Sequence, residues 1–354
     1  VSNEADAGVV VEGRFLIGRD EEVGLLRRRW EQSMEGSGQV VVLTGEAGIG
    51  KSTLVETLYG TIAESGGIRV VFRCSPYHQN SALYPTIEHL QRVLQFERED
   101  TPAEKLEKLE QMLKGYQFTA DDTVPLFAAL LSVPLPEGRY PPLTLSPQQQ
   151  RQYTHDALVA WLTEETARTP VLAVFEDLHW ADASTMEMVG VLVEEVPTVR
   201  MLIVLTARPE FVPPWPPRSH LTPLTLNRLE RPQVAALVKH LAGGKTLPGQ
   251  VVQHVVSKTD GVPLFVEELT KTLLESDILE VADGHYRLTG PLASLSIPST
   301  LHDSLMARLD RLPESKETAQ LGSVLGREFA YEMVKALTTE VDEALQSRLG
   351  EPVS

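Results

Sequence analysis

The sequence predicts an α/β protein, with a parallel sheet covered by helices on both faces and a helical region after it. The first observation is a set of four continuous apolar runs of strand length, at residues 40–43, 68–72, 171–175 and 201–206. Such runs are typical of strands that are buried on both faces. The second observation is that helix-like segments alternate with these runs, as in folds built from a parallel sheet.

The third observation is a glycine-rich segment between the first strand and a helix that continues from Thr53. It reads Gly45-Glu46-Ala47-Gly48-Ile49-Gly50-Lys51-Ser52. This is a complete phosphate-binding loop of the form G-x-x-x-x-G-K-[ST] in its expected context. Backbone N–H groups and the helix N-terminus would cradle phosphates, Lys51 would contact the same oxygens, and Ser52 would ligate Mg²⁺. We therefore expect nucleoside triphosphate binding rather than a plain turn.

Composition narrows the function classes for this chain of 354 residues. A net charge of −17 argues against a large nucleic-acid interface, and no apolar run is long enough to cross a bilayer. Cys74 is the only cysteine, which excludes an intrachain disulfide. The sequence has neither a signal peptide nor an initiator methionine, and it ends within a helix-like run. We expect a fragment of a larger cytoplasmic protein.

A long, mostly helical insertion, at about residues 75–165, separates the second and third apolar runs. Two segments predict helix starts by capping boxes with proline at the first position, one from Thr101 and one from Ser146. Residues 133–145 and 209–217 are rich in proline and are expected to be loops. From about Leu226 the pattern turns helical, with helices predicted around residues 234–241 and 263–274. A hairpin is predicted at 278–288, and a further helix is expected to begin at Thr300.

Charged residues follow the third and fourth strands at their carboxyl ends. Glu176 and Asp177 end the third strand, where ligands gather in open α/β sheets, and we expect them to hold Mg²⁺ and polarise the attacking water. The alternative for this pair is a solvated turn. Arg208 follows the fourth strand and is placed either to sense the γ-phosphate or to lie in a surface loop. His179 has either a structural or a γ-phosphate-coupling role, with a packed histidine as the alternative.

These motifs together resemble the signal-transduction ATPases with numerous domains (STAND), a group of AAA-like P-loop ATPases. The resemblance is carried by residues 15–21, 176–182, 206–208, 261–268, 297–301, 307–312 and 325–329. The resemblance implies that Ile17, Gly18, Arg19 and Pro263 lie near the adenine of ATP or ADP. It also implies a P-loop NTPase core over residues 1–225, a helical lid over 226–290 and the start of a winged-helix domain over 291–354.

Within this group the sequence is most similar to modules that follow class III adenylate/guanylate cyclase domains in bacterial signalling proteins, often ahead of tetratricopeptide repeats. The resemblance implies a slow regulatory ATPase switch, attached to such domains and capable of self-association. Cyclase activity is not expected in this fragment. One departure is Glu176, where most P-loop ATPases have Asp, so either Glu176 or Asp177 could be the Mg²⁺ partner. The alternatives are a non-hydrolysing nucleotide-bound scaffold and the ATPase core of a LuxR-like transcription regulator.

Overall fold

A computed structural model describes residues 9–11, 14–276, 278–282, 284–290, 333 and 335. The chain divides into two compact units, Val1–Asn227 and Arg228–Ser354. The predicted winged-helix start, including the helix from Thr300, lies outside the described residues apart from 333 and 335. In the part that is described, no helix combines the length and apolar character needed to cross a membrane.

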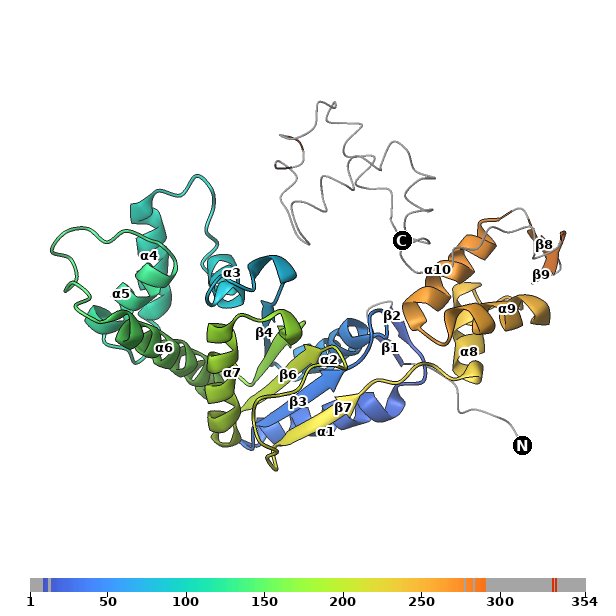
Figure 1. Ribbon diagram of the computed structural model, residues 1–354, viewed down its shortest axis with the longest axis horizontal. Coiled ribbons are helices and arrows are strands. Elements are labelled where there is room, and N and C mark those ends of the chain that lie inside the picture. Colours follow the sequence, from blue (N-terminus) through green and yellow to red (C-terminus); the bar gives the residue numbers. More distant parts are fainter. Residues whose placement is uncertain are drawn as a thin grey trace. The chain divides into compact units, whose positions relative to one another are not determined.

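The first unit is built on a parallel sheet of five strands (Figure 1). Its strands are β3 (Gln39–Thr44), β4 (Ile68–Arg73), β5 (Val171–Glu176), β6 (Met201–Ala207) and β7 (Leu221–Thr225), in the spatial order β4-β5-β6-β3-β7. The four apolar runs of the sequence are β3 to β6, as predicted. A separate antiparallel pair, β1 (Val9–Val11) and β2 (Arg14–Leu16), precedes them.

Helices cover both faces of this sheet (Figure 1). Helices α1 (Asp20–Met34) and α2 (Lys51–Glu64) pack on one face, through a core that includes Trp30 and Leu58. The other face is covered by α3 (Tyr84–Val93), α4 (Pro102–Leu113), α5 (Ala120–Leu130), α6 (Pro147–Arg168) and α7 (Ala183–Glu195). Three short 3₁₀ turns, η1 (Pro76–His78), η2 (Leu178–Trp180) and η3 (Val196–Thr198), complete the unit.

The helical insertion consists of α3 to α6, and both predicted capping boxes are present. The Thr101 backbone N–H donates to Glu104 Oε2 at 2.7 Å, and the Glu104 N–H donates back to Thr101 Oγ1 at 3.3 Å. Ser146 and Gln149 make the same exchange at the start of α6. Helix α5 was not predicted, and it packs against both α4 and α6.

Strand β7 forms one edge of the sheet, because among the described strands it pairs with β3 alone. It contains Pro223, which lacks the N–H that a central strand would use, and an edge position tolerates it. Since all five strands are parallel, their carboxyl ends meet at one edge of the sheet. This edge brings together residues 45–50 after β3, 177 after β5 and 208 after β6.

The second unit contains three mutually packed helices, α8 (Arg231–Leu241), α9 (Gly249–Thr259) and α10 (Pro263–Leu274). A hairpin of β8 (Leu279–Ala282) and β9 (His285–Leu288) follows, as predicted. Helix α9 was not predicted. Gly261, between α9 and α10, has a φ of 75°, and a Cβ there would lie 2.2 Å from the Leu229 carbonyl oxygen. Glycine is therefore required at this turn both by its conformation and by the close backbone approach.

Candidate functional site

The predicted phosphate loop joins the carboxyl end of β3 to the first residue of α2. The N–H of Gly45 donates to the carbonyl oxygen of Ala207 at 3.2 Å, which fastens the loop to the end of β6. Gly50 has a φ of 97°, a left-handed conformation that glycine adopts without steric cost. Gly50 is the N-cap residue of α2, so the loop ends at the helix N-terminus. The partial positive charge at this end of the helix favours anions.

Lys51 is a buried cation inside this loop. Its side chain is 9% exposed, and its Nζ donates to the carbonyl oxygens of Gly45 and Glu46 at 2.8 and 2.9 Å. Burial lowers the pKa of Lys51, the positive charge of Arg208 lowers it further, and Asp177 acts in the opposite direction. An anion bound at this place would offset the cost of burying the charge.

The two predicted acids have different surroundings. Glu176 Oε2 lies 3.5 Å from Arg73 Nε, across the register pair that joins β5 to β4. Asp177 has a left-handed backbone with a φ of 54°, and its N–H donates to Thr206 Oγ1 at 2.9 Å. The charge of Asp177 also acts on the pKa of Lys51. Asp177 thus acts electrostatically on Lys51 of the phosphate loop, while Glu176 is paired with Arg73 of β4.

Arg208 lies at the same edge and lines a pocket of about 550 Å³. The other lining residues are His179, Trp180, Glu210, Phe211 and Val212. Arg208 is half-buried, and its charge acts on the pKa of both Lys51 and His179. Gly45 is hydrogen-bonded to Ala207, the neighbour of Arg208, so the structure places Arg208 near the phosphate loop, and its contact with the γ-phosphate stays a prediction.

The N-terminal motif contacts the phosphate loop through Arg19. This side chain is buried, and its Nη2 donates to the carbonyl oxygens of Ile49 at 3.3 Å and Asn227 at 2.5 Å. Its Nη1 pairs with Glu22 at 3.2 Å. Ile17 is also buried, and Gly18 has a φ of 65°. The guanidinium thus holds the loop to the chain segment that follows β7.

Ser52 and Thr53 lie in the first turn of α2, where Ser52 is exposed and open to a ligand.

Pro263 belongs to the second unit and is the first residue of α10. Its predicted position beside the adenine stays a prediction. Among the described residues, no group of three or more His, Cys, Asp or Glu side chains could hold a metal ion without other ligands.

Two supporting residues were not assigned roles from the sequence. Thr206 is 4% exposed, and its hydroxyl accepts a hydrogen bond from the Asp177 N–H. A polar residue within an apolar strand is the signal in the sequence that points to such a supporting role. Asp182 is 5% exposed and caps α7 by accepting from the Thr185 N–H at 3.0 Å. It also accepts from the Leu83 N–H at 3.1 Å, which holds the segment before α3. The Asp-x-x-Thr spacing was the signal for this cap.

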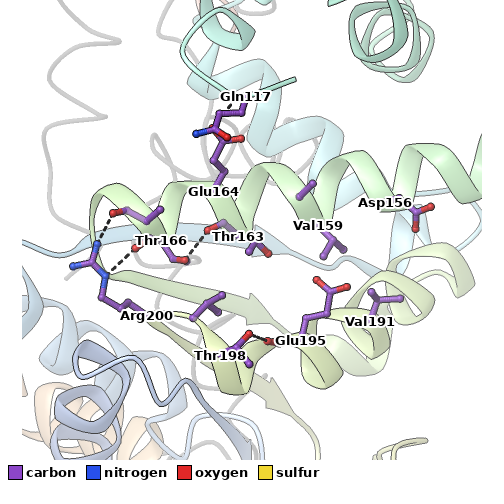
Figure 2. A pocket seen from close by; sticks show the side chains of 13 residues that line it. Gln117, Asp156, Val159, Thr163, Glu164, Thr166, Val191, Glu195, Thr198 and Arg200 are labelled. Carbon is purple, nitrogen blue, oxygen red and sulfur yellow. Dashed lines mark hydrogen bonds between the residues drawn. The ribbon is translucent and has the colours of Figure 1, made fainter. Parts of the chain in front are cut away.

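A larger pocket, of about 710 Å³, lies between α6 and α7 (Figure 2). Arg200 borders it and donates to the carbonyl oxygens of Thr166 at 3.0 Å and Ala167 at 2.7 Å, at the end of α6. Arg200 immediately precedes β6, so this border lies at the amino ends of the strands, opposite the phosphate loop. None of the residues predicted for the nucleotide site lines this pocket.

Several known proteins are similar to the chain. "Uncharacterized protein R02095" of Rhizobium meliloti (strain 1021) is 25% identical over 335 residues, which are 92% of this chain and 31% of that protein. A STAND protein with a tetratricopeptide repeat sensor, PH0952 from Pyrococcus horikoshii, is 12% identical with a TM-score of 0.49, covering 97% of this chain and 40% of its own. Drosophila ORC bound to DNA is 11% identical with a TM-score of 0.35, covering 73% and 53%. The chain thus spans about a third of its curated relative.

Family models match both units. A domain of unknown function (DUF8739) matches residues 230–287, which are most of the described second unit. The AAA ATPase domain matches residues 16–205, more than half of the chain, and this range contains the phosphate loop and both acids. The matched range also includes strands β3 to β5 and most of β6. Because the match covers more than half of the chain, together with the phosphate loop, we conclude that the chain belongs to the AAA ATPase domain family.

Proposed function

We propose that this chain binds Mg²⁺-ATP at the carboxyl edge of β3, β5 and β6 and hydrolyses it slowly to ADP and phosphate. The observation that carries the proposal is Lys51, a buried cation held inside a complete phosphate loop by the carbonyls of Gly45 and Glu46. A buried ammonium next to backbone donors is suited to the phosphates of a nucleotide.

Each part of the site has a proposed role in binding. The backbone N–H groups of residues 45–50 and Lys51 contact the β- and γ-phosphates, and Arg208 contacts the γ-phosphate. The exposed Ser52 hydroxyl and one of the two acids are suitable ligands for Mg²⁺, which prefers oxygen and usually keeps several waters. Bound there, Mg²⁺ would neutralise charge on the phosphate oxygens. Ile17, Gly18, Arg19 and Pro263 are proposed to lie toward the adenine.

Asp177 is the acid that we propose to activate water. Its charge acts on Lys51, whereas Glu176 is paired with Arg73 on the neighbouring strand. The Asp177 carboxylate would accept a proton as the water oxygen bonds to the γ-phosphorus and the bond to ADP breaks. Turnover is expected to be slow, because P-loop NTPases often need a residue from a partner to complete the site.

The wider role that we propose is a regulatory switch within a larger signalling protein. Nucleotide would bridge the core and the lid, and its hydrolysis would change their arrangement. The attached domains would sense a signal or produce an output, as a cyclase domain or tetratricopeptide repeats would, and self-association could be part of the response. The length of the curated relative, about three times the matched segment, supports the presence of further domains.

ATP turnover by the 354-residue chain tests the proposal directly. Phosphate release should depend on Mg²⁺ and should fall to background in Lys51→Ala. Lys239→Ala, an exposed lysine on α8, is the matched control and should retain the wild-type rate. Tight ATP binding without any phosphate release would instead indicate a nucleotide-bound scaffold.

A further inference from the structure

His179 is the feature of the site that the proposed roles leave unexplained. It lies in η2, two residues after Asp177, and its ring packs against Trp180 with centroids 4.9 Å apart. Both ring nitrogens are buried, and neither has a hydrogen-bond partner among the residues that the structure describes. A neutral imidazole carries one donor and one acceptor, so two hydrogen-bonding groups of this ring are unsatisfied.

The other histidines in the described ranges differ from His179 in this respect. His78, His89, His155 and His254 each have one buried nitrogen without a partner, and His179 has two. The His89 ring hydrogen-bonds the backbone of Val71 and packs against Phe72, as a histidine in a core should. Burying an unpaired donor or acceptor is unfavourable, so two on one ring call for a partner from outside the chain.

The charges around His179 indicate what that partner is. The groups that act on its ring are Asp177, Arg208, Lys51 and Glu210. Two of them, Lys51 and Arg208, are the cations proposed to contact phosphate, and Asp177 is the acid proposed to activate water. His179 and Arg208 also line the same pocket. The ring therefore lies among the groups that are proposed to contact the end of the phosphate chain.

We propose that His179 contacts the γ-phosphate by donating a hydrogen bond to one of its oxygens, and so distinguishes ATP from ADP. This inference rests on the proposed function, because it adds a residue to the same nucleotide site. A phosphate oxygen accepts the ring N–H, and the nucleophilic water or the Arg208 guanidinium can donate to the other nitrogen. ADP offers no γ-oxygen, so with ADP bound the ring stays unsatisfied.

Two substitutions separate this role from simple packing. His179→Leu keeps apolar volume and removes both hydrogen-bonding groups, whereas His179→Asn keeps one donor and one acceptor. His89→Leu is the matched control, because His89 is a buried histidine that faces the core. Affinities for ADP and for a non-hydrolysable ATP analogue, both with Mg²⁺, are measured calorimetrically on the full chain, together with thermal unfolding without nucleotide.

In His179→Leu we expect affinity for the ATP analogue to fall about tenfold or more, with ADP affinity unchanged. His179→Asn should recover part of the loss, and His89→Leu should leave the ratio of the two affinities unchanged. Without nucleotide, His179→Leu should unfold at the same or a higher temperature, because it removes two unsatisfied groups, whereas a packing role predicts a lower one.

The inference is overturned if the wild type binds both nucleotides and His179→Leu leaves their affinity ratio unchanged, or weakens ADP equally. The proposed function survives that result, since Lys51 and the loop still account for binding. If the wild type binds neither nucleotide, the proposed function and this inference fail together. Lowered thermal stability of His179→Leu with an unchanged ratio would identify His179 as a packed residue.

Discussion

The backbone N–H of Asp177 donates to the Thr206 hydroxyl at 2.9 Å, and this bond joins the ends of two neighbouring strands. Asp177 lies just after β5 in a left-handed conformation, and Thr206 is the sixth of seven buried residues in β6. The hydroxyl therefore holds the turn that directs the Asp177 carboxylate. A single hydrogen bond thus links the stability of the sheet edge to the position of the proposed base.

Removing this hydroxyl should affect both stability and turnover. Thr206→Val preserves the shape of the side chain and leaves the Asp177 N–H without its acceptor. We expect the free energy of unfolding to fall by about 1–3 kcal/mol, measured by urea denaturation. ATP turnover should fall as well, while Thr206→Ser, which keeps the hydroxyl, should retain most of both. Equal stability of the Val and Ser variants would contradict this role.

The two acids should respond differently to amide substitution. Asp177→Asn keeps the shape but removes the proton acceptor, so kcat should fall by about 100-fold or more with a smaller change in nucleotide affinity. Glu176→Gln should have the smaller effect on kcat, because Glu176 pairs with Arg73. Asp121→Asn, on the exposed side of α5, is the control. Wild-type turnover in both site variants would show that neither acid activates water.

Lys51 should make stability depend on pH at alkaline values. The pKa of Lys51 is lowered in the folded chain from the usual value of 10.5. Between the lowered pKa of the folded chain and the usual pKa of the unfolded chain, the unfolded chain therefore binds more protons at this residue. The contribution of Lys51 to stability without nucleotide should therefore rise with pH through this window. Lys51→Met carries no such charge, so its unfolding free energy relative to wild type should be highest near pH 7 and should decline toward pH 10.5. A difference that stays constant from pH 7 to 10.5 would argue against a buried charge.

Gly261 should be essential to the second unit. Gly261→Ala places a Cβ in a left-handed backbone and 2.2 Å from the Leu229 carbonyl oxygen, so both strain and steric overlap oppose it. We expect a loss of about 2 kcal/mol or more in unfolding free energy. The control is Gly244→Ala, which has a φ of 78° and open space around the new Cβ, and should lose only about 1 kcal/mol. Equal losses would mean that Leu229 can move aside.

Nucleotide state should change protection in the lid if the proposed switch operates. Hydrogen exchange over residues 226–274 should differ between ADP and a non-hydrolysable ATP analogue, because a ligand shifts an equilibrium only through differential affinity. Arg208→Ala should reduce that difference by removing a γ-phosphate contact. The same exchange pattern in both nucleotide states would indicate a rigid unit and no switch within this chain.

Several features of this protein follow from local sequence. Strands β3 to β6 are continuous apolar runs because both of their faces are covered, and that burial leaves a pattern visible in one dimension. The phosphate loop and the two capping boxes are likewise recognisable, since each depends on residues a few positions apart. The sequence Gly261-Val262-Pro263 also predicts the local conformation. Gly261 has a left-handed backbone, and Pro263 is the first residue of α10.

Other features depend on residues that are distant in the sequence. Strand β7 escaped prediction because an edge strand, half-exposed and containing Pro223, lacks the apolar run of a buried one. Only the tertiary structure brings Arg19 to the carbonyls of Ile49 and Asn227, and Glu176 to Arg73. The same is true of the unsatisfied nitrogens of His179. The packing of separate strands decides whether a buried polar group has a hydrogen-bond partner. The spacing of residues within a motif cannot predict this, because the partner is distant in the sequence.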